Sequence, residues 1–244
     1  MASKLVRRHF EFEQTAVTIL CEEHFSGVAE RSIFRSREII QRFILFDPLF
    51  QDTLEPYAEP EHIDPLIGRM CHAARCAEVG PMAAVAGAIA EEAVKAMVEA
   101  GAEHAVVDNG GDIAMFLSEP LDIALYAGQS SIRDVGFRLP GGRRIYGVCT
   151  SSGTVGPSIS FGTADAAVVF AEDVCLADAC ATRLGNEVKS TDERVMRHAL
   201  DVVLQIEGVD GALVVAGERM VMRGHVPELV KVKMNPDGIS QKYF

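Results

Sequence analysis

The chain contains 244 residues with a formal net charge of −12, and 48% of its residues are hydrophobic and 24% charged. These shares are typical of a globular protein and argue against a disordered or fibrous chain. The acidic balance disfavours nucleic acid and anionic membranes as main partners, because both require a basic surface. The length fits one domain, residues 1–244, which we expect to fold alone or as a small homo-oligomer.

The sequence favours a cytoplasmic protein. Residues 79–90 form the longest nearly apolar stretch, well short of the roughly 20 residues needed to cross a bilayer. Glu11 and Glu13 occupy the place where a secretory signal would need an apolar run. The six cysteines are too sparse for a disulfide scaffold and suit buried, reduced thiols.

The first hundred residues alternate between helical periodicity and polar breaks. The predicted elements are, in chain order, a strand over 10–20, a helix over 37–46 capped by Ser36, an irregular acidic connection over 47–65, and helices over 65–77 and 82–100. Gly101 ends the last of these helices as the residue after its C-cap.

Turn residues divide residues 102–150 into short strands. Asn109, Gly110 and Gly111 separate two β-rich runs and predict a tight hairpin, because glycine adopts a positive φ without strain. Further strands are expected over 121–126, 135–139 and 143–150, the last two joined by a turn at 140–142 into a meander.

The second half of the chain repeats this pattern. A helical region from about Leu176, continuing over 190–206, precedes a second apolar hairpin that begins at Gly211. A chance match between short apolar strings is the alternative to an internal duplication. We predict an α+β fold with mostly antiparallel sheets and packed helices, arranged as two related helix–hairpin halves around a shared cleft.

Asn109, Gly110, Gly111 and Asp112 form the first candidate ligand-binding segment. Glycine amides without side-chain shielding let an oxygen-rich ligand approach the backbone closely. A plain hairpin turn explains the Asn-Gly pair equally well, although it requires neither Gly111 nor Asp112.

Thr150, Ser151, Ser152 and Gly153 form the second candidate segment. Hydroxyl and amide groups in such a run can bind phosphate or sugar oxygens. No Lys follows, so the run is not a Walker loop. A solvated loop is the alternative.

Asp178 and Thr182 are four residues apart and therefore share one face of a helix. A carboxylate and a hydroxyl suit a hard cation such as Mg²⁺, with waters and ligand phosphates completing the octahedron. The alternative is a structural role, in which Asp178 stabilises the helix start and Thr182 bonds back to a carbonyl.

The cysteines do not predict a metal site. Residues five apart on a helix, such as Cys71 and Cys76, point roughly 140° apart. No second cysteine pair completes a tetrahedron with His72, and the same argument applies to Cys175 and Cys180.

Taken together and in order, these segments resemble the ApbE-like superfamily of flavin transferases, which move FMN from FAD onto a Thr or Ser hydroxyl of a target protein with Mg²⁺. The family's glycine-rich flavin segment resembles residues 107–113, and its Thr-Ser-Gly run resembles residues 149–153. Its A-D-A-x-A-T motif matches residues 177–182, which is the most specific match. The resemblance covers residues 79–217 and implies an α+β fold of two related halves.

The resemblance also implies roles for individual residues. Asp178 and Thr182 would bind Mg²⁺ together with a backbone carbonyl at Ala83 or Ala84. The two candidate segments would bind the flavin nucleotide FAD, and an acceptor protein would be the second partner. Asp165 is then the candidate catalytic carboxylate.

The sequence departs from the transferases at two places. Residues 156–162 contain neither the His nor the Asp of the family's His-x-x-Asp-Pro-x-Thr-Gly loop, and Ala86 stands where the family has Lys. The chain therefore resembles a shorter, cytoplasmic, poorly characterised branch, in which fold and ligand carry over better than activity. Three hypotheses stay open: a Mg²⁺-dependent transferase, a non-catalytic nucleotide-binding protein, and a thiol enzyme that uses Cys149.

Overall fold

A computed structural model describes residues 5–12, 15–128, 130–153 and 162–232. Within these ranges the strands are β1 (Leu5–Phe12), β2 (Thr15–Glu22), β3 (Ala105–Asn109), β4 (Asp112–Phe116), β5 (Leu121–Ala124), β6 (Val135–Leu139), β7 (Ile145–Ser151), β8 (Ala166–Ala171), β9 (Val209–Ala216), β10 (Arg219–Gly224) and β11 (Glu228–Lys231). The helices are α1 (Ser26–Phe46), α2 (Leu49–Asp52), α3 (Pro65–Ala77), α4 (Val85–Glu99), α5 (Val174–Glu187) and α6 (Glu193–Val203), with short 3₁₀ turns η1 (Glu23–Phe25) and η2 (Pro81–Ala84).

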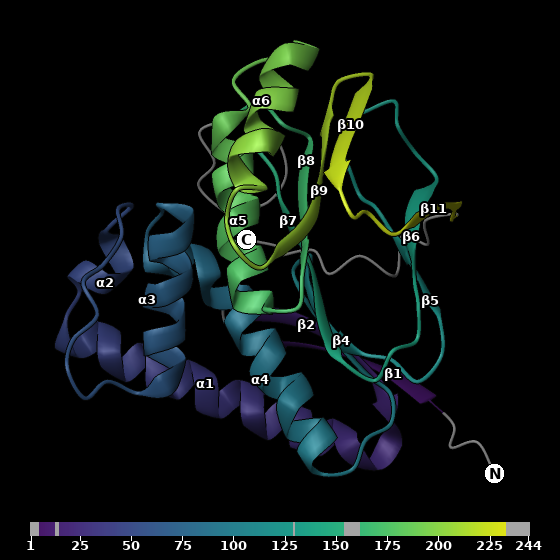
Figure 1. Ribbon diagram of the computed structural model, residues 1–244. Helices are drawn as coiled ribbons and strands as arrows, with labels where there is room; N and C mark the ends of the chain where they lie inside the picture. The colour runs from purple at the N-terminus through teal and green to yellow at the C-terminus, as the bar shows by residue number, and fades with distance from the viewer. Residues whose placement is uncertain (1–4, 13–14, 129, 154–161, 233–244) are drawn as a thin grey trace.

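These elements form three layers. Helices cover one face of an eight-stranded sheet with the order β1-β2-β3-β4-β7-β8-β9-β10, and the three-stranded sheet β11-β6-β5 lies on the other side (Figure 1). Every pairing between described strands is antiparallel. The predicted α+β class with mostly antiparallel sheets is confirmed.

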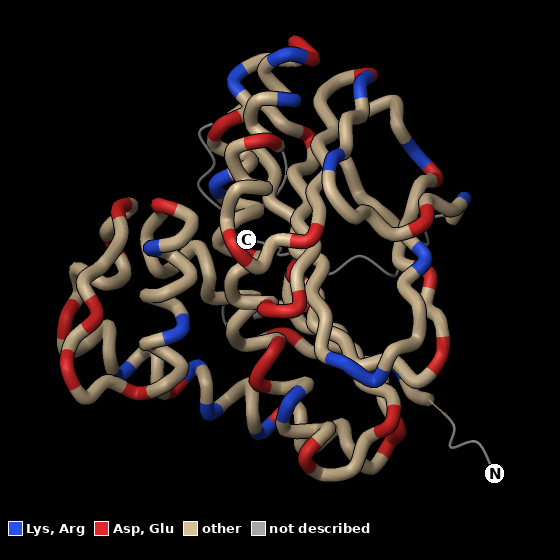
Figure 2. The backbone as a smooth tube through the Cα atoms, viewed as in Figure 1, with Lys and Arg blue, Asp and Glu red and all other residues tan. Residues whose placement is uncertain are grey.

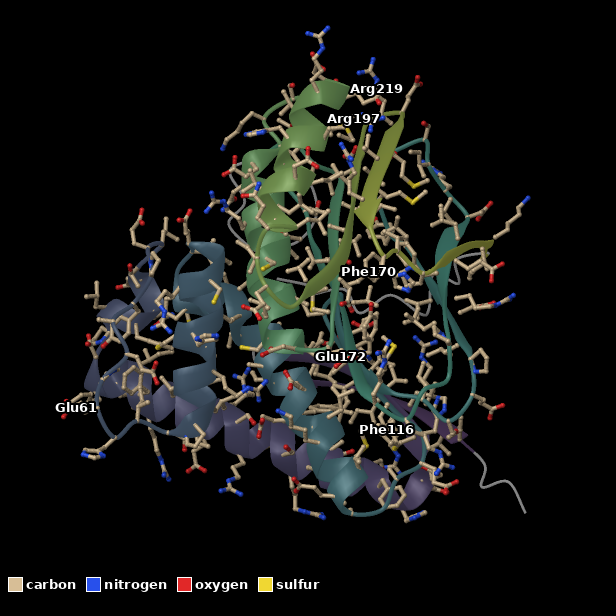
Figure 3. All side chains as sticks on the ribbon, in the orientation of Figure 1. Glu61, Phe116, Phe170, Glu172, Arg197 and Arg219 are labelled. Atoms are coloured by element: carbon tan, nitrogen blue, oxygen red, sulfur yellow. The ribbon has the colours of Figure 1, made fainter. Side chains whose placement is uncertain are left out.

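The core is divided by the large sheet into two apolar clusters. On β8, Val169 packs in the cluster beneath the helices, whereas Val168 and Phe170 pack in the cluster between the sheets. The Phe170 ring (labelled in Figure 3) meets the ring of Phe137 of the small sheet edge-on, and the ring centroids are 4.9 Å apart. The central strand is therefore apolar on both faces, which explains why its sequence lacks alternation.

Both predicted hairpins are confirmed. In the β3–β4 hairpin, Gly110 and Gly111 have φ of +71° and +102°, values that only glycine adopts without strain. In the β9–β10 hairpin, Gly217 has φ of +62°. Each hairpin follows a helical segment, α4 or the pair α5 and α6, so the predicted arrangement of two helix–hairpin halves is present within one sheet.

The helices agree with the sequence pattern over most of their length. Helix α3 spans the predicted residues 65–77, and α4 begins at Val85 after the 3₁₀ turn. Gly101 has φ of +102° and its N–H donates to the Val98 carbonyl (2.9 Å), as expected beyond a C-cap. Among the described helices, none combines the length and apolar composition that spanning a bilayer requires.

The N-terminal prediction is wrong in two respects. Two paired antiparallel strands, β1 and β2, are present where one strand over 10–20 was expected. The charged outer strand β1 lies at the sheet edge, where polar side chains are tolerated, so its sequence lacks an apolar signal. Helix α1 begins at Ser26, and Ser36 is buried inside it, because Ala29 and Ile33 extend its apolar face.

The predicted meander of β6 and β7 is also wrong. Strand β6 pairs with β5 and β11, and β7 pairs with β4 and β8. Residues 140–142 cross from one sheet to the other, and the Gly142 N–H donates to the Leu117 carbonyl (3.0 Å). A glycine turn alone cannot distinguish a hairpin from a crossover. Strand β11 was not predicted.

His104 generates a prediction about pH. Its imidazole is buried, its Nε2 atom has no hydrogen-bond partner, and burial lowers its pKa below the ordinary 6.5. Because the unfolded chain binds this proton more readily, the stability contributed by neutral His104 is present above pH 6.5 and is lost as the pH falls below it.

We therefore expect the unfolding free energy of His104→Gln to fall less steeply than that of wild type between pH 7.5 and 5.5. The difference in slope is at most about 1.4 kcal/mol per pH unit, and the melting temperature should follow the same trend. Thermal unfolding at several pH values measures this. The exposed His198→Gln serves as the control, and an equal slope in His104→Gln and wild type would contradict the prediction.

Candidate functional site

One peptide group connects three of the segments that the sequence singled out. The carbonyl of Ala86 accepts a hydrogen bond from Asn109 Nδ2 (3.1 Å), and the N–H of Gly87 donates to Asp178 Oδ2 (2.8 Å). This carbonyl and this N–H belong to the same planar unit. The start of α4, the glycine turn and α5 therefore meet at the Ala86–Gly87 peptide.

Helices α4 and α5 cap each other across this contact. Gly87 lies in the first turn of α4, where N–H groups lack intrahelical partners and where Ala84 at the N-cap offers no side-chain acceptor. Asp178 of α5 supplies that acceptor, and Glu91 of α4 accepts from the Cys175 N–H in the first turn of α5 (3.2 Å). Each carboxylate also faces the positive end of the other helix dipole.

Glu91 is a structural residue that the sequence analysis did not recognise. It is 5% exposed, and its carboxylate forms ion pairs with Lys95 (2.8 Å) and with Arg69 of α3. Its partners on α3 and α5 are distant in the chain, so no local pattern in the sequence distinguishes Glu91 from an exposed helix residue. Only the packing of three helices identifies its role.

The glycine turn and the Thr150–Gly153 segment lie side by side. In the sheet register Asn109 pairs with Asp112, and Asp112 pairs with Cys149. The Thr150 N–H donates to Asp112 Oδ1 (3.3 Å). The two segments predicted to bind the nucleotide are therefore neighbours at one end of the sheet.

Exposure rises along the second segment. Ser151 is buried, Ser152 is half-buried and Gly153 is exposed. The Gly153 N–H donates to the Ala164 carbonyl (2.9 Å), which holds the end of the segment against the residues before β8. The segment therefore runs from the buried Ser151 to the exposed Gly153, and its later residues are accessible to solvent.

Electrostatics at this end of the sheet oppose a reactive thiol. Cys149 is fully buried, and its Sγ donates to the Val174 carbonyl (3.6 Å). Burial raises the Cys149 pKa well above its ordinary value, and the nearby carboxylates of Asp112 and Asp178 raise it further. A protonated thiol without solvent access is a poor nucleophile, so the structure disfavours the thiol hypothesis.

The residues predicted to bind a metal lie on adjacent elements. Asp178 is 7% exposed, Thr182 is half-buried one helical turn further along α5, and Ala83 belongs to η2, which packs against α5. Because α4 begins at Val85, the Ala83 carbonyl lies outside the hydrogen-bond ladder of that helix. The donor set is a carboxylate, a hydroxyl and a carbonyl, all hard oxygen ligands of the kind that Mg²⁺ prefers.

Other metal chemistry finds no support in the described ranges. They contain no group of three or more His, Cys, Asp or Glu residues that could hold a metal ion. His72 Nε2 and Cys76 Sγ approach to 3.6 Å on the outer side of α3 without such a group around them. The proposed Mg²⁺ site has a single carboxylate, Asp178, and so does not depend on a group of three such residues.

Asp165 lies immediately before β8, close to the end of the Thr150–Gly153 segment. Its Oδ2 accepts from the Gly217 N–H at the β9–β10 turn (2.7 Å), and its own N–H donates to the Val215 carbonyl (2.8 Å). Its carboxylate therefore anchors the second hairpin at the sheet end that carries the other candidate residues. Residues 154–161, which include most of the segment replacing the family's His/Asp loop, lie outside the described residues.

A surface hollow of about 360 Å³ lies beside α3. Arg69 and His72 of α3 and Asp173 at the N-cap of α5 contribute to its lining. None of the lining residues belongs to the predicted ligand or metal site.

The chain is similar to known proteins over most of its length. A model of the family described as AbpE bacteria matches residues 1–228. A UPF0280 protein from Methanothrix thermoacetophila is 48% identical, covering 97% of this chain and 100% of the relative. A UPF0280 protein from Methanosarcina acetivorans is 46% identical, covering 97% and 93%.

Solved structures share the fold at low sequence identity. The apo flavinyl transferase ApbE of Pseudomonas stutzeri is 12% identical with a TM-score of 0.58, covering 91% of this chain and 94% of that one. The ApbE protein of Thermotoga maritima is 12% identical with a TM-score of 0.61, covering 89% and 96%. Similarity at this identity shows the fold alone.

The helix contact generates a prediction about Gly87. A Cβ atom at this position would lie 2.6 Å from the Val174 carbonyl oxygen and 2.7 Å from Asp178 Cβ. Neither atom can move without shifting α5. We expect Gly87→Ala to lower the unfolding free energy by about 1 to 3 kcal/mol, measured by urea unfolding.

Gly27→Ala in α1 is the matched control. Its Cβ would meet only the flexible end of Arg31, at 3.4 Å. This substitution should be neutral or stabilising by about 0.5 to 1 kcal/mol. Equal effects of the two substitutions would show that helix propensity, and not the α4–α5 approach, determines the outcome.

Proposed function

This chain belongs to the AbpE bacteria family, and from that premise we propose that it binds FAD with Mg²⁺ and transfers the FMN part to a hydroxyl of an acceptor protein. The observation that carries the proposal is the shared Ala86–Gly87 peptide, which brings the glycine turn and Asp178 together. The segments to which we assign flavin and metal binding are far apart in sequence, and this contact supports the assignment because it brings them together in space.

The proposed nucleotide site uses the backbone of the glycine turn and the hydroxyls of the Thr150–Gly153 segment. Gly110 is exposed and has no side chain, so a pyrophosphate can approach the turn closely there. The Gly111 N–H donates to Asp108 Oδ1 (2.9 Å), which fixes the shape of the turn. Thr150 and Ser152, both half-buried, add hydroxyl donors beside the turn. Asp112 holds the two segments in register through the Thr150 N–H.

The proposed metal site consists of Asp178, Thr182 and the carbonyl of Ala83. A bound Mg²⁺ would supply positive charge against the pyrophosphate of FAD. Asp178 also accepts from the Gly87 N–H, so the carboxylate is oriented by the protein before any cation binds. Such preorganisation favours a fixed geometry over a flexible surface site.

In the proposed transfer, the acceptor hydroxyl oxygen forms a bond to the FMN phosphorus while the bond from that phosphorus to the bridging pyrophosphate oxygen breaks. AMP is the leaving group, and the hydroxyl proton passes to a carboxylate. We assign this proton acceptor to Asp165, which lies beside the end of the Thr150–Gly153 segment.

Binding without turnover is the second candidate function. It is favoured by Ala86, which stands in place of the Lys of the transferases, and by residues 156–162, which lack their His and Asp. Under this alternative the site would hold a flavin or another nucleotide for storage or redox exchange. The two experiments below distinguish the candidates.

We expect calorimetric titration with FAD to show micromolar binding that depends on Mg²⁺. Asp178→Asn keeps an oxygen acceptor for the Gly87 N–H but removes the charge, so it should retain the fold and lose at least about 10-fold in Mg²⁺-dependent affinity. Asp173→Asn, the same change at the N-cap of the same helix, should bind like wild type.

Two outcomes of this titration would contradict the proposal. If wild type binds no FAD with or without Mg²⁺, the ligand assignment is wrong. If Asp178→Asn responds to Mg²⁺ as wild type does, then Asp178 is a structural cap and the metal lies elsewhere.

Transfer itself is tested by Mg²⁺-dependent release of AMP from FAD in the presence of Ser- and Thr-containing peptides. Asp165→Asn keeps an acceptor for the Gly217 N–H, so we expect unchanged FAD affinity with AMP release slowed about 100-fold or more. Tight FAD binding without AMP release by wild type would instead support the non-catalytic alternative.

A further inference from the structure

Exposed apolar side chains are concentrated at one corner of the molecule, where α1 ends and α2 begins. Of the six large apolar side chains that are exposed in the described ranges, four lie within residues 45–54: Leu45 (83%), Phe46 (84%), Leu49 (60%) and Leu54 (55%). Single exposed apolar residues are normal, but a contiguous group marks an interaction surface. We call these four residues the apolar corner.

The apolar corner is held rigidly from beneath. The ring of Phe50 meets Phe43 and Tyr57 edge-on, with centroid distances of 4.8 and 5.3 Å. The Tyr57 hydroxyl donates to Asp47 Oδ2 (2.5 Å), and the Leu49 N–H donates to Asp47 Oδ1 (3.1 Å). A corner fixed in this way presents its side chains to a partner with little ordering cost.

Charge is arranged with opposite sign on the two sides of the apolar corner. The outer face of α1 exposes Arg31, Arg35 and Arg42, with Glu38 bonded to Arg42. The segment after the corner exposes only acids among its charged residues over 52–61, and Glu61 projects from this edge (Figure 3). Figure 2 shows blue segments along α1 and red segments in the loop beside α2.

From this arrangement we propose that the outer face of α1 and the apolar corner form a homodimer interface related by a twofold axis. In a twofold contact the same surface appears on both sides, so a suitable surface must complement itself. Two antiparallel α1 helices, each about 31 Å long, would bring the apolar corners inward. Each basic helix face would then lie against the acidic 52–61 segment of its partner.

A membrane is a poorer occupant of the same surface. Exposed acids, including Asp52 and Glu55, flank the apolar corner, and anionic headgroups would repel them. The chain as a whole carries a net charge of −12. A second copy of the chain brings the arginines that these acids require.

Sedimentation analysis at about 1 to 100 µM protein tests the interface. Wild type should dimerise, and raising the salt concentration should weaken the dimer because exposed charge pairs are screened. Leu45→Lys with Phe46→Lys should be monomeric and keep the circular dichroism spectrum of the wild type, which shows that the variant is folded. The control is Met222→Lys, which changes an exposed apolar residue (45%) on β10 and should dimerise like wild type.

Charge reversal tests the twofold geometry. Variant one carries Arg31→Glu and Arg35→Glu, and variant two carries Asp52→Lys and Glu55→Lys. Alone, each should fail to dimerise, because like charges face each other in both copies of the contact. Mixed, they should form a one-to-one heterodimer, because both contacts regain opposite charges.

Three results would overturn the proposal. They are a monomeric wild type across the concentration range, a dimer that survives Leu45→Lys with Phe46→Lys, and a mixture of the two charge variants that stays monomeric. FAD binding does not enter any of these measurements, so the interface and the proposed function stand or fall separately.

Discussion

The position of the candidate site depends on the hydrogen bonding of one peptide group. The Ala86–Gly87 unit offers its carbonyl to Asn109 and its N–H to Asp178, which joins the sheet, α4 and α5 at a single point. The Gly87 N–H lies in the first turn of α4 and has no intrahelical acceptor, so loss of Asp178 would leave it unsatisfied at a cost of about 1 to 3 kcal/mol. The glycine turn and α5 are therefore held in a fixed relation.

Close packing is the condition for that contact. Gly87 allows α5 to approach the start of α4, and Gly147 on β7 allows Val174 of the same helix to approach the sheet, since a Cβ there would lie 3.1 Å from the Val174 Cα. With small residues at both places, α5 lies close to the sheet end where Asp112 and Thr150 meet. The glycine turn, the Thr150–Gly153 segment and Asp178 can therefore lie close together because Gly87 and Gly147 have no side chains that would keep α5 away.

Local chemistry made part of this predictable from sequence. Asn109 and Gly110 specify the hairpin turn, and the resemblance of residues 177–182 to a known motif pointed to Asp178. Long-range pairing was not predictable: β6 joins the small sheet although its sequence fits a meander, and Glu91 is buried only because distant helices supply its partners. Ligand and metal roles at the site remain predictions, because hydrogen bonds that serve the fold account for the same side chains.

The reciprocal capping of α4 and α5 also bears on the dynamics of the protein. Asp178 of α5 accepts from the Gly87 N–H and Glu91 of α4 accepts from the Cys175 N–H, so separation of the two helices breaks both contacts. Local opening of the two helices is therefore coupled into one cooperative unit. In hydrogen exchange, the amides of Gly87 and Cys175 would share one protection factor, even though they are separated by nearly ninety positions in the chain.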